Sequence, residues 1–446
     1  MKINIQIPSI NNENKIIANI SCVELGASST VEVDFENLLP FVSSDNMDAV
    51  DLFLLSTFVY GIDRFIDRHS FSVDGWSRKL EVKFPVYNLS KWNGLNVKME
   101  ELLSFLTGDY WRISFYKNKL NIPLIKKPHG LKSIFKQVNL FSGGLDSLIG
   151  AIDFLTDTST EKLLVISHFD PHISARKEQN YLRSKLIERY SDKFNFVPSV
   201  SVSLSISNIE KEKTFRSRSF LFIGIAVLVA NYNKIPIMVP ENGTVSLNFP
   251  LSSSRRSACS TRTTHPSFLN QTNELLALLN FDTTLNNIYD LKTKGEMVKE
   301  CKDLPFLKTI VAASNSCGKR GHRANWTLKN KDHCGVCMPC IYRQAALQTF
   351  ADGTEYGNSI KKKFTGRNNQ TPFLLSKQGQ DFGACLDFLR KPLTNDEIRN
   401  ELLVNGINNL EKLDRYVELV NRTRVELCNW IKKEGDPFIK KKAGLK

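Results

Sequence analysis

Residues 142–147 constrain the fold of this chain more than any other segment. They read Ser-Gly-Gly-Leu-Asp-Ser and stand between an apolar stretch that ends at Phe141 and an apolar run over residues 148–155. This order predicts a strand, a tight glycine turn and a buried helix, with Ser142, Asp146 and Ser147 pointing to one place. Two adjacent glycines let the backbone approach a phosphate, and a helix N-terminus offers N–H groups to it. No lysine follows the glycines, which excludes a Walker P-loop.

Strand and helix patterns alternate over residues 136–350. Apolar runs predict strands at residues 163–167, 196–204 and 236–240, and helices at residues 178–190 and 217–230. This order predicts an α/β fold with a parallel sheet and helices on both faces. Ligands of such sheets bind beyond the carboxyl ends of the strands. Residue 142 and the segments 168–170 and 241–243 all fall there.

Residues 1–130 are expected to form an N-terminal α+β domain. Apolar residues alternate in several short segments and predict strands, at residues 3–7, 31–35, 80–84 and 113–115. Longer apolar patterns predict helices over residues 49–65 and 99–106. The sequence Lys-Lys-Pro-His-Gly at residues 126–130 is typical of a linker.

The C-terminal region, residues 375–446, is expected to be helical. Thr394 and Glu397 have the spacing of a capping box. Apolar side chains then recur at helical spacing and predict a packing face, at Leu410, Leu413, Val417, Val420 and Leu427.

Four of the nine cysteines follow a metal-binding pattern. Cys317, Cys334, Cys337 and Cys340 have the spacing C-x16-C-x2-C-x2-C. Four thiolates complete a tetrahedral zinc site, and they leave no position for water, so the predicted site is structural. Reduced cysteines without a metal, or an iron–sulfur cluster, are the alternatives for the same residues. His322 and His333 flank the cysteines but are not needed as ligands.

Composition favours a soluble cytoplasmic protein with an affinity for anions. The 60 Lys and Arg exceed the 46 Asp and Glu and give a formal net charge of +14. This charge attracts polyanions, so nucleic-acid binding stays open. No apolar run reaches the ~20 residues of a membrane span, and the N-terminus has no signal-peptide pattern. The odd cysteine number argues against a disulfide framework.

The glycine segment and the cysteine pattern together resemble a known family. The first resembles the PP-loop of ATP pyrophosphatases, which belong to the HUP-type α/β folds. The second, with Ser316 before it and Arg343 after it, is similar to the zinc knuckle of the 7-cyano-7-deazaguanine synthase (QueC) family. The resemblance covers residues 136–350, with the knuckle at residues 317–340. The longer architecture is most similar to QueC-like proteins of bacterial anti-phage operons, such as the Qat system.

The resemblance implies sites for ATP and Mg²⁺. ATP phosphates would bind the loop formed by Ser142, Gly143, Gly144, Leu145, Asp146 and Ser147. The adenine would lie at the strand end near His168 and Asp170. Asp146 would orient Mg²⁺ or the phosphates. Lys294, Arg218 and Arg343 are the candidate catalytic cations, and an ion pair without a catalytic role is the alternative for each.

A substrate site is implied by two further segments. Glu241, Asn242 and Gly243 follow a strand and could bind a guanine-like edge, although a plain turn is equally consistent with them. The biosynthetic family has a Tyr-Pro-Asp-Cys-Arg loop that helps form the base pocket. This chain has a longer segment instead, and its cationic character comes from Arg255, Arg256, Arg262 and His265. Either the pocket is rebuilt around a deazaguanine, or another acid or acceptor binds.

The implied activity is ATP-dependent ligation. The carboxylate of 7-carboxy-7-deazaguanine, or of an analogue, would attack the α-phosphate and release pyrophosphate. An amine, either ammonia or an amine of a partner protein, would then displace AMP. Two alternatives remain: a PP-loop enzyme that modifies RNA, and a nucleotide-sensing scaffold without turnover.

Overall fold

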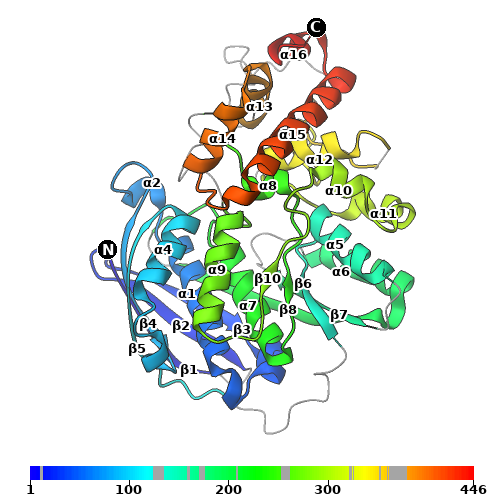
Figure 1. The fold of residues 1–446 in the computed structure, drawn as a ribbon. Coiled ribbons are helices and arrows are strands. Elements are labelled where there is room, and N and C mark those ends of the chain that lie inside the picture. The colour runs from blue at the N-terminus through cyan, green and yellow to red at the C-terminus, as the bar shows by residue number, and fades with distance from the viewer. Residues whose placement is uncertain are drawn as a thin grey trace.

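A single mixed sheet organises the chain in the computed structural model (Figure 1). The structure describes residues 1–10, 14–123, 135–157, 161–169, 176–206, 209–252, 262–320, 324, 326–350, 353–358, 360 and 379–445. Several predicted features lie outside these residues: the linker at 126–130, Asp170, Arg255, Arg256 and His322.

The sheet has ten strands in the order β10-β9-β6-β7-β8-β3-β2-β1-β4-β5, and most neighbouring pairs are parallel. The strands are β1 (Lys2–Ile10), β2 (Lys15–Cys22), β3 (Ala27–Asp34), β4 (Lys79–Val86), β5 (Tyr110–Lys117), β6 (Phe135–Leu140), β7 (Lys162–Phe169), β8 (Phe194–Ile206), β9 (Ile237–Met238) and β10 (Leu285–Asn286). The pairs β1–β2, β2–β3 and β3–β8 are antiparallel. The half that carries the glycine loop, β6 to β10, is parallel throughout, as its strand–helix alternation predicted.

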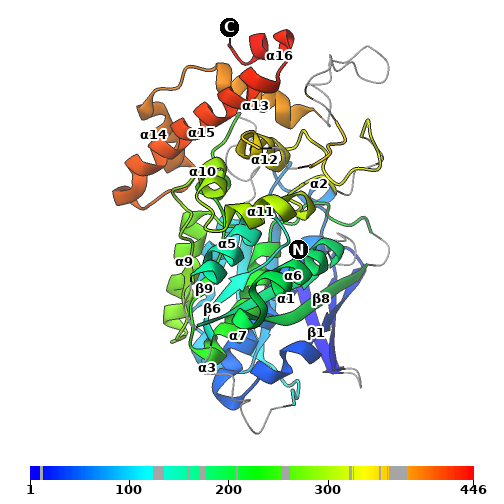
Figure 2. The ribbon, with the colours of Figure 1, turned by 90° about the vertical axis from the view of Figure 1, so that its right-hand side faces the viewer.

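Helices cover both faces of this parallel half, and Figure 2 shows the molecule from the side. The first eight helices are α1 (Met47–Phe65), α2 (Arg68–Phe71), α3 (Leu89–Trp92), α4 (Asn96–Thr107), α5 (Leu145–Thr156), α6 (Arg176–Tyr190), α7 (Arg218–Asn233) and α8 (Gly243–Leu247). The others are α9 (Pro266–Leu278), α10 (Lys294–Lys299), α11 (Leu304–Ile310), α12 (Met338–Leu347), α13 (Gln380–Arg390), α14 (Asn395–Val404), α15 (Leu413–Glu434) and α16 (Pro437–Lys442).

Strand β7 shows why both faces are covered. Leu164 and Ile166 join the core on the side of α1 and α7, whereas Leu163 and Val165 join the core under α5 and α6. Side chains of a strand alternate between the two faces of its sheet. A continuous apolar run therefore needs an apolar partner layer on each side.

The N-terminal region shares its sheet and its core with the glycine-loop region. Val33 of β3 pairs with Val202 of β8, and one hydrophobic cluster runs from Ile3 to Leu285. In the part of the chain that is described, neither the sheet nor this core is interrupted between the two regions. A division into domains near residue 130 stays a prediction.

The C-terminal helices form a separate apolar cluster at the end of the molecule away from β1 to β5 (Figure 1). The predicted capping box of Thr394 and Glu397 is confirmed, and Leu413, Val417, Val420 and Leu427 are buried. Leu410 was wrongly included in the stripe, because it precedes α15 and is 69% exposed. No helix among the described residues is long and apolar enough to cross a membrane.

A buried cluster of four charges joins the N-terminal helices to the start of α7. Asp63 accepts hydrogen bonds from Arg68 and Arg78, and both arginines also donate to Asp109. The second oxygen of Asp63 accepts from the backbone N–H and the hydroxyl of Ser217, at 3.0 and 2.7 Å. Burial by itself would raise the pKa of Asp63, but the two arginines hold it well below its usual range. The cluster therefore stays charged and fixes the residue that caps α7.

We expect the substitution Asp63→Asn to lower the free energy of unfolding by about 3–5 kcal/mol, because it leaves buried arginine charge without its partner. Urea denaturation followed by circular dichroism measures this loss. Asp45→Asn is the control, since Asp45 is exposed, and it should change stability by less than about 0.5 kcal/mol. Equal effects of the two substitutions would contradict a structural role for the cluster.

Candidate functional site

The predicted strand, glycine turn and helix are confirmed as β6, residues 141–144 and α5. Gly143 has φ +80°, a conformation that favours glycine, and a Cβ there would lie 3.0 Å from the Gln179 side chain. The Ser142 and Ser147 hydroxyl oxygens are 3.2 Å apart. The Gly144 N–H donates to Ser142 Oγ at 3.3 Å. The loop thus gathers two hydroxyls and a backbone N–H at the N-terminus of α5.

Gln179 and Ser316 extend this loop, and neither was among the predicted site residues. Gln179 Nε2 donates to the carbonyl oxygens of Ser142, at 3.2 Å, and His168, at 3.4 Å, and so connects the ends of β6 and β7. Ser316 Oγ accepts from the Leu145 N–H at 3.3 Å. Ser316 directly precedes Cys317, so this hydrogen bond connects the cysteine segment to the glycine loop.

A buried ion pair lies at the start of α5. Lys294 Nζ donates to both carboxylate oxygens of Asp146, at 2.8 and 2.7 Å, and the two residues are 3% and 7% exposed. Asn242 Nδ2 donates to Asp146 Oδ2 at 3.0 Å. The structure therefore brings together Asp146, Lys294 and Asn242, which the sequence pointed to separately.

Glu241 is a second acidic residue beside Asp146. Its burial, and then the neighbouring charge of Asp146, raise the pKa of Glu241 well above its usual value. For Asp146, burial acts in the same direction, but Lys294 and the hydrogen bonds from Glu241 and Asn242 outweigh it and lower the pKa. These opposite pKa shifts favour an ionised Asp146 as the partner of Lys294 and the protonated form of Glu241 beside it.

Asn242 and Gly243 also stabilise the local fold. Asn242 caps α8, because its side-chain oxygen accepts from the Val245 N–H at 3.1 Å. A Cβ at Gly243 would lie 2.1 Å from the carbonyl oxygen of Asp290, so only glycine permits this approach. Their predicted contact with a substrate stays a prediction.

The four predicted cysteines form a group that could hold a metal ion such as zinc. The Sγ atoms of Cys317, Cys334, Cys337 and Cys340 all lie within 4.8 Å of one another, and no other residue belongs to the group within the described segments. Gly335 turns the chain with φ +82°. The Val336 and Cys337 N–H groups donate to Cys334 Sγ at 3.4 and 3.2 Å. These backbone donors favour thiolate over thiol, which is the form that binds metals.

Arg343 lies in the core and bonds to protein groups. Its guanidinium donates to Ser314 Oγ, the Val311 carbonyl and Thr354 Oγ1, at 2.8, 2.8 and 3.0 Å, and the residue is 0% exposed. It holds α12 against the segment that leads to Ser316. These three hydrogen bonds give Arg343 a structural role, and its catalytic role stays a prediction.

Arg218 and His168 form a second group beside the loop. The Arg218 guanidinium lies over the Phe222 ring, and the His168 ring packs against Tyr60 and Phe222. Neither ring nitrogen of His168 has a hydrogen-bond partner among the described residues. Burial, and then the charge of Arg218, lower the pKa of His168 well below its usual value. His168 is therefore a neutral side chain next to the loop.

Arg262 and His265 both pack on Phe105 of α4. The Arg262 guanidinium is 4.3 Å from the Phe105 ring centre and donates to its carbonyl oxygen at 3.2 Å. Burial, and then Arg262, lower the pKa of His265 to about 3. His265 is thus uncharged at neutral pH, so the expectation that it adds charge to a cationic loop is wrong. Its Nδ1 instead accepts from the Ser267 N–H and caps α9.

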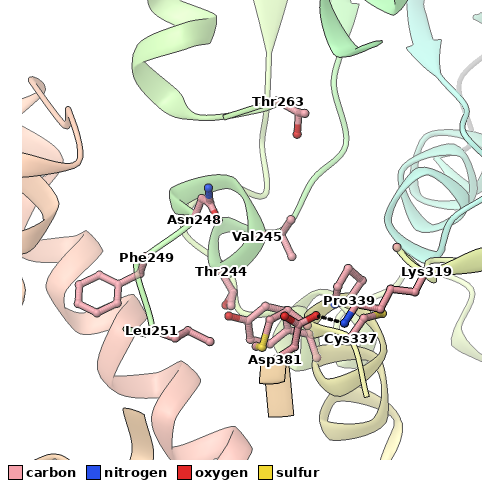
Figure 3. A pocket seen from close by; sticks show the side chains of 13 residues that line it. Thr244, Val245, Asn248, Phe249, Leu251, Thr263, Lys319, Cys337, Pro339 and Asp381 are labelled. Carbon is pink, nitrogen blue, oxygen red and sulfur yellow. Dashed lines mark ion pairs between the residues drawn. The ribbon is translucent and has the colours of Figure 1, made fainter. Parts of the chain in front are cut away.

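A cavity of about 220 Å³ lies between α8, Thr263, the cysteine group and the start of α13 (Figure 3). Thr244, Asn248, Phe249 and the Lys319–Asp381 ion pair, 3.1 Å long, contribute to its wall. The cavity combines apolar walls with a few polar groups, as small-molecule sites do, but it is smaller than most. Helix α8 connects it to Asp146, since Asn242 caps that helix.

No protein-family model matches the chain, and no curated protein or solved structure is significantly similar to it.

The ion pair gives a pH-dependent prediction. Lys294→Met leaves the buried Asp146 without its cation and should cost about 3–5 kcal/mol of unfolding free energy at pH 7.5. The pKa of Asp146 is lowered in the native protein, so its ionised form is stabilised above the unfolded carboxylate pKa of about 4. In the variant, burial raises the pKa of Asp146, and protonation at lower pH relieves the unpaired charge.

The stability difference between the two proteins should therefore shrink as the pH falls from 7.5 toward 5. Urea denaturation at several pH values measures it. Lys299→Met is the matched control, because Lys299 is an exposed lysine of the same helix. A cost that does not change with pH would contradict the assignment of the charged pair.

Proposed function

We propose that the chain is an ATP-dependent enzyme of the 7-cyano-7-deazaguanine synthase (QueC)-like PP-loop type that forms AMP and pyrophosphate. It adenylates the carboxylate of 7-carboxy-7-deazaguanine, or of an analogue, and transfers the acyl group to ammonia or to an amine of a partner protein, in anti-phage defence. One observation carries the proposal: the glycine loop, at the carboxyl end of a parallel strand, lies next to the buried Asp146–Lys294 pair.

The loop fits a phosphate group. Hydroxyls of Ser142, Ser147 and Ser316 and the N–H groups of Gly144 and Leu145 all lie at the N-terminus of α5. The two hydrogen bonds that these N–H groups donate to serine hydroxyls are long, at 3.3 Å. The charged oxygens of an anion would accept stronger hydrogen bonds from the same N–H groups.

The carboxylate of Asp146 is a poor ligand for Mg²⁺ in this arrangement, because Lys294 neutralises its charge and its two oxygens accept three hydrogen bonds from Lys294 and Asn242. Asp146 instead holds the ammonium of Lys294 beside the phosphate loop. A cation in a buried site stabilises negative charge that develops on the reacting phosphate far better than one in water.

In the proposed reaction a carboxylate oxygen of the acid attacks the α-phosphorus, and the bond from that phosphorus to the bridging oxygen breaks. Pyrophosphate leaves with that electron pair. The amine nitrogen then attacks the acyl carbon, AMP leaves with the carbon–oxygen bonding pair, and the amine loses one proton. The loop donors and Lys294 act in the first step, where charge shifts to pyrophosphate.

Pyrophosphate release from ATP tests the proposal. We expect release that depends on 7-carboxy-7-deazaguanine, and Ser147→Ala should slow it about 100-fold because one phosphate donor is lost. Ser184→Ala is the matched control, since Ser184 is an exposed helical serine whose hydroxyl also bonds to the main chain. Mass spectrometry of the mixture, with ammonia or with proteins encoded beside the chain, identifies the acceptor. Acid-independent release, or none, would contradict the proposal.

The metal is proposed to be zinc, with a structural role at Cys317, Cys334, Cys337 and Cys340. Elemental analysis should find about one zinc per chain, and Cys337→Ser should abolish it. Cys428→Ser should retain the metal, because Cys428 lies outside the group. Iron and visible absorbance would instead indicate an iron–sulfur cluster.

An RNA-modifying enzyme is the second candidate, and the net charge of +14 is the observation that favours it. Nucleic-acid binding that weakens steeply with salt, together with pyrophosphate release dependent on RNA, would support it over the first.

A further inference from the structure

Helix α15 contacts both elements that hold Asp146 in place. Thr423 of α15 shares a hydrogen bond with Thr244 of α8, with their hydroxyl oxygens 2.6 Å apart. One turn further on, Glu426 contacts the start of α10. Asn242 caps α8, and α10 begins with Lys294. Helix α15 therefore contacts the two helices whose first residues place Asn242 and Lys294, two of the side chains that donate to Asp146.

Glu426 accepts hydrogen bonds from the residues on both sides of Lys294. Its Oε2 accepts from the Thr293 hydroxyl at 2.7 Å, and its two oxygens accept from the Gly295 N–H at 3.2 and 3.1 Å. The Thr293 hydroxyl in turn accepts from the Glu296 N–H at 3.1 Å. Both neighbours of Lys294 are thus fixed by one carboxylate.

Gly295 makes this contact feasible. A Cβ at this position would lie 2.4 Å from Glu426 Oε2, so any other residue would displace the carboxylate. Arg422, one turn before Glu426, donates to Glu296 Oε1 at 2.7 Å and anchors the same turn of α10 a second time. Helix α15 therefore contacts Thr293, Gly295 and Glu296, the three residues of this turn that surround Lys294.

We propose that Glu426 is a positioning residue, which fixes the backbone at Thr293 and Gly295 so that the Lys294 ammonium stays on Asp146. The C-terminal helical region thereby controls the geometry of the candidate catalytic cation. The effect on turnover rests on the proposed function, whereas the effect on the position of Lys294 does not.

The position of Lys294 can be measured by chemical acylation of the full-length chain, with acetic anhydride as the probe and peptide mapping by mass spectrometry. Lys294 is buried and paired, so it should react slowly in the wild type. Glu426→Ala should raise its rate about tenfold relative to the exposed Lys299, because the start of α10 opens more often. Gly295→Ala should act in the same direction without changing any charge.

Two variants distinguish positioning from a general loss of stability. Glu426→Gln keeps an oxygen that accepts from the same donors, so Lys294 should stay nearly as protected as in the wild type. Glu418→Ala changes an exposed glutamate of the same helix and should have no effect. Unchanged acylation of Lys294 in both Glu426→Ala and Gly295→Ala would overturn the proposal, even if one variant folds poorly.

Turnover supplies the second measurement. In acid-dependent pyrophosphate release, Glu426→Ala should lower kcat about 10- to 100-fold with little change in the KM for ATP, because a misplaced cation affects the reaction more than binding. Glu426→Gln should restore most of kcat. An effect on KM alone would contradict positioning. If the wild type releases no pyrophosphate, the proposed function fails, and the acylation result still decides the role of Glu426.

Discussion

The buried pair of Asp146 and Lys294 is the interaction on which the candidate site depends. Two charges that are 7% and 3% exposed are tolerated in a protein interior only when geometry and further hydrogen bonds compensate for their lost hydration. Asn242 and Glu241 supply those bonds. The pair therefore requires that the start of α5, the turn before α8 and the start of α10 keep their relative positions. A buried ion pair contributes little net stability, and groups with shifted pKa values are common in functional sites, so the pair supports the site that we propose.

The regions outside the glycine-loop segment support this centre from two sides. The N-terminal strands extend the sheet, and the buried cluster around Asp63 fixes Ser217, which begins α7 next to Arg218 and His168. The C-terminal helix α15 contacts α8 and α10 from the opposite end of the molecule (Figure 1). The cysteine group reaches the loop through Ser316. A metal in that group would therefore stiffen one edge of the proposed phosphate site.

Local patterns made part of this structure predictable. The glycine turn, the strand and the helix that flank it, and the grouping of the four cysteines depend on residues close in sequence, and they were predicted correctly. The contact between Asp146 and Lys294 spans 148 residues and is set by the order of the strands, so only the residues, and not their pairing, could be named. The antiparallel pairing of β3 with β8 could not be predicted either, because the alternation of apolar and polar residues identifies a strand but not its neighbour in the sheet. His265 was misjudged because its burial against Phe105 depends on the fold.

Oxygen tracing is the most direct test of the proposed attack of a carboxylate on the α-phosphate of ATP beside this ion pair. Acid labelled with ¹⁸O in its carboxylate is incubated with ATP, an amine and the full-length chain, and the nucleotide products are analysed by mass spectrometry. We expect one ¹⁸O atom in the phosphate of AMP, because the acyl–oxygen bond breaks when the amine displaces AMP. Label in inorganic phosphate together with ADP, or AMP without label, would contradict it.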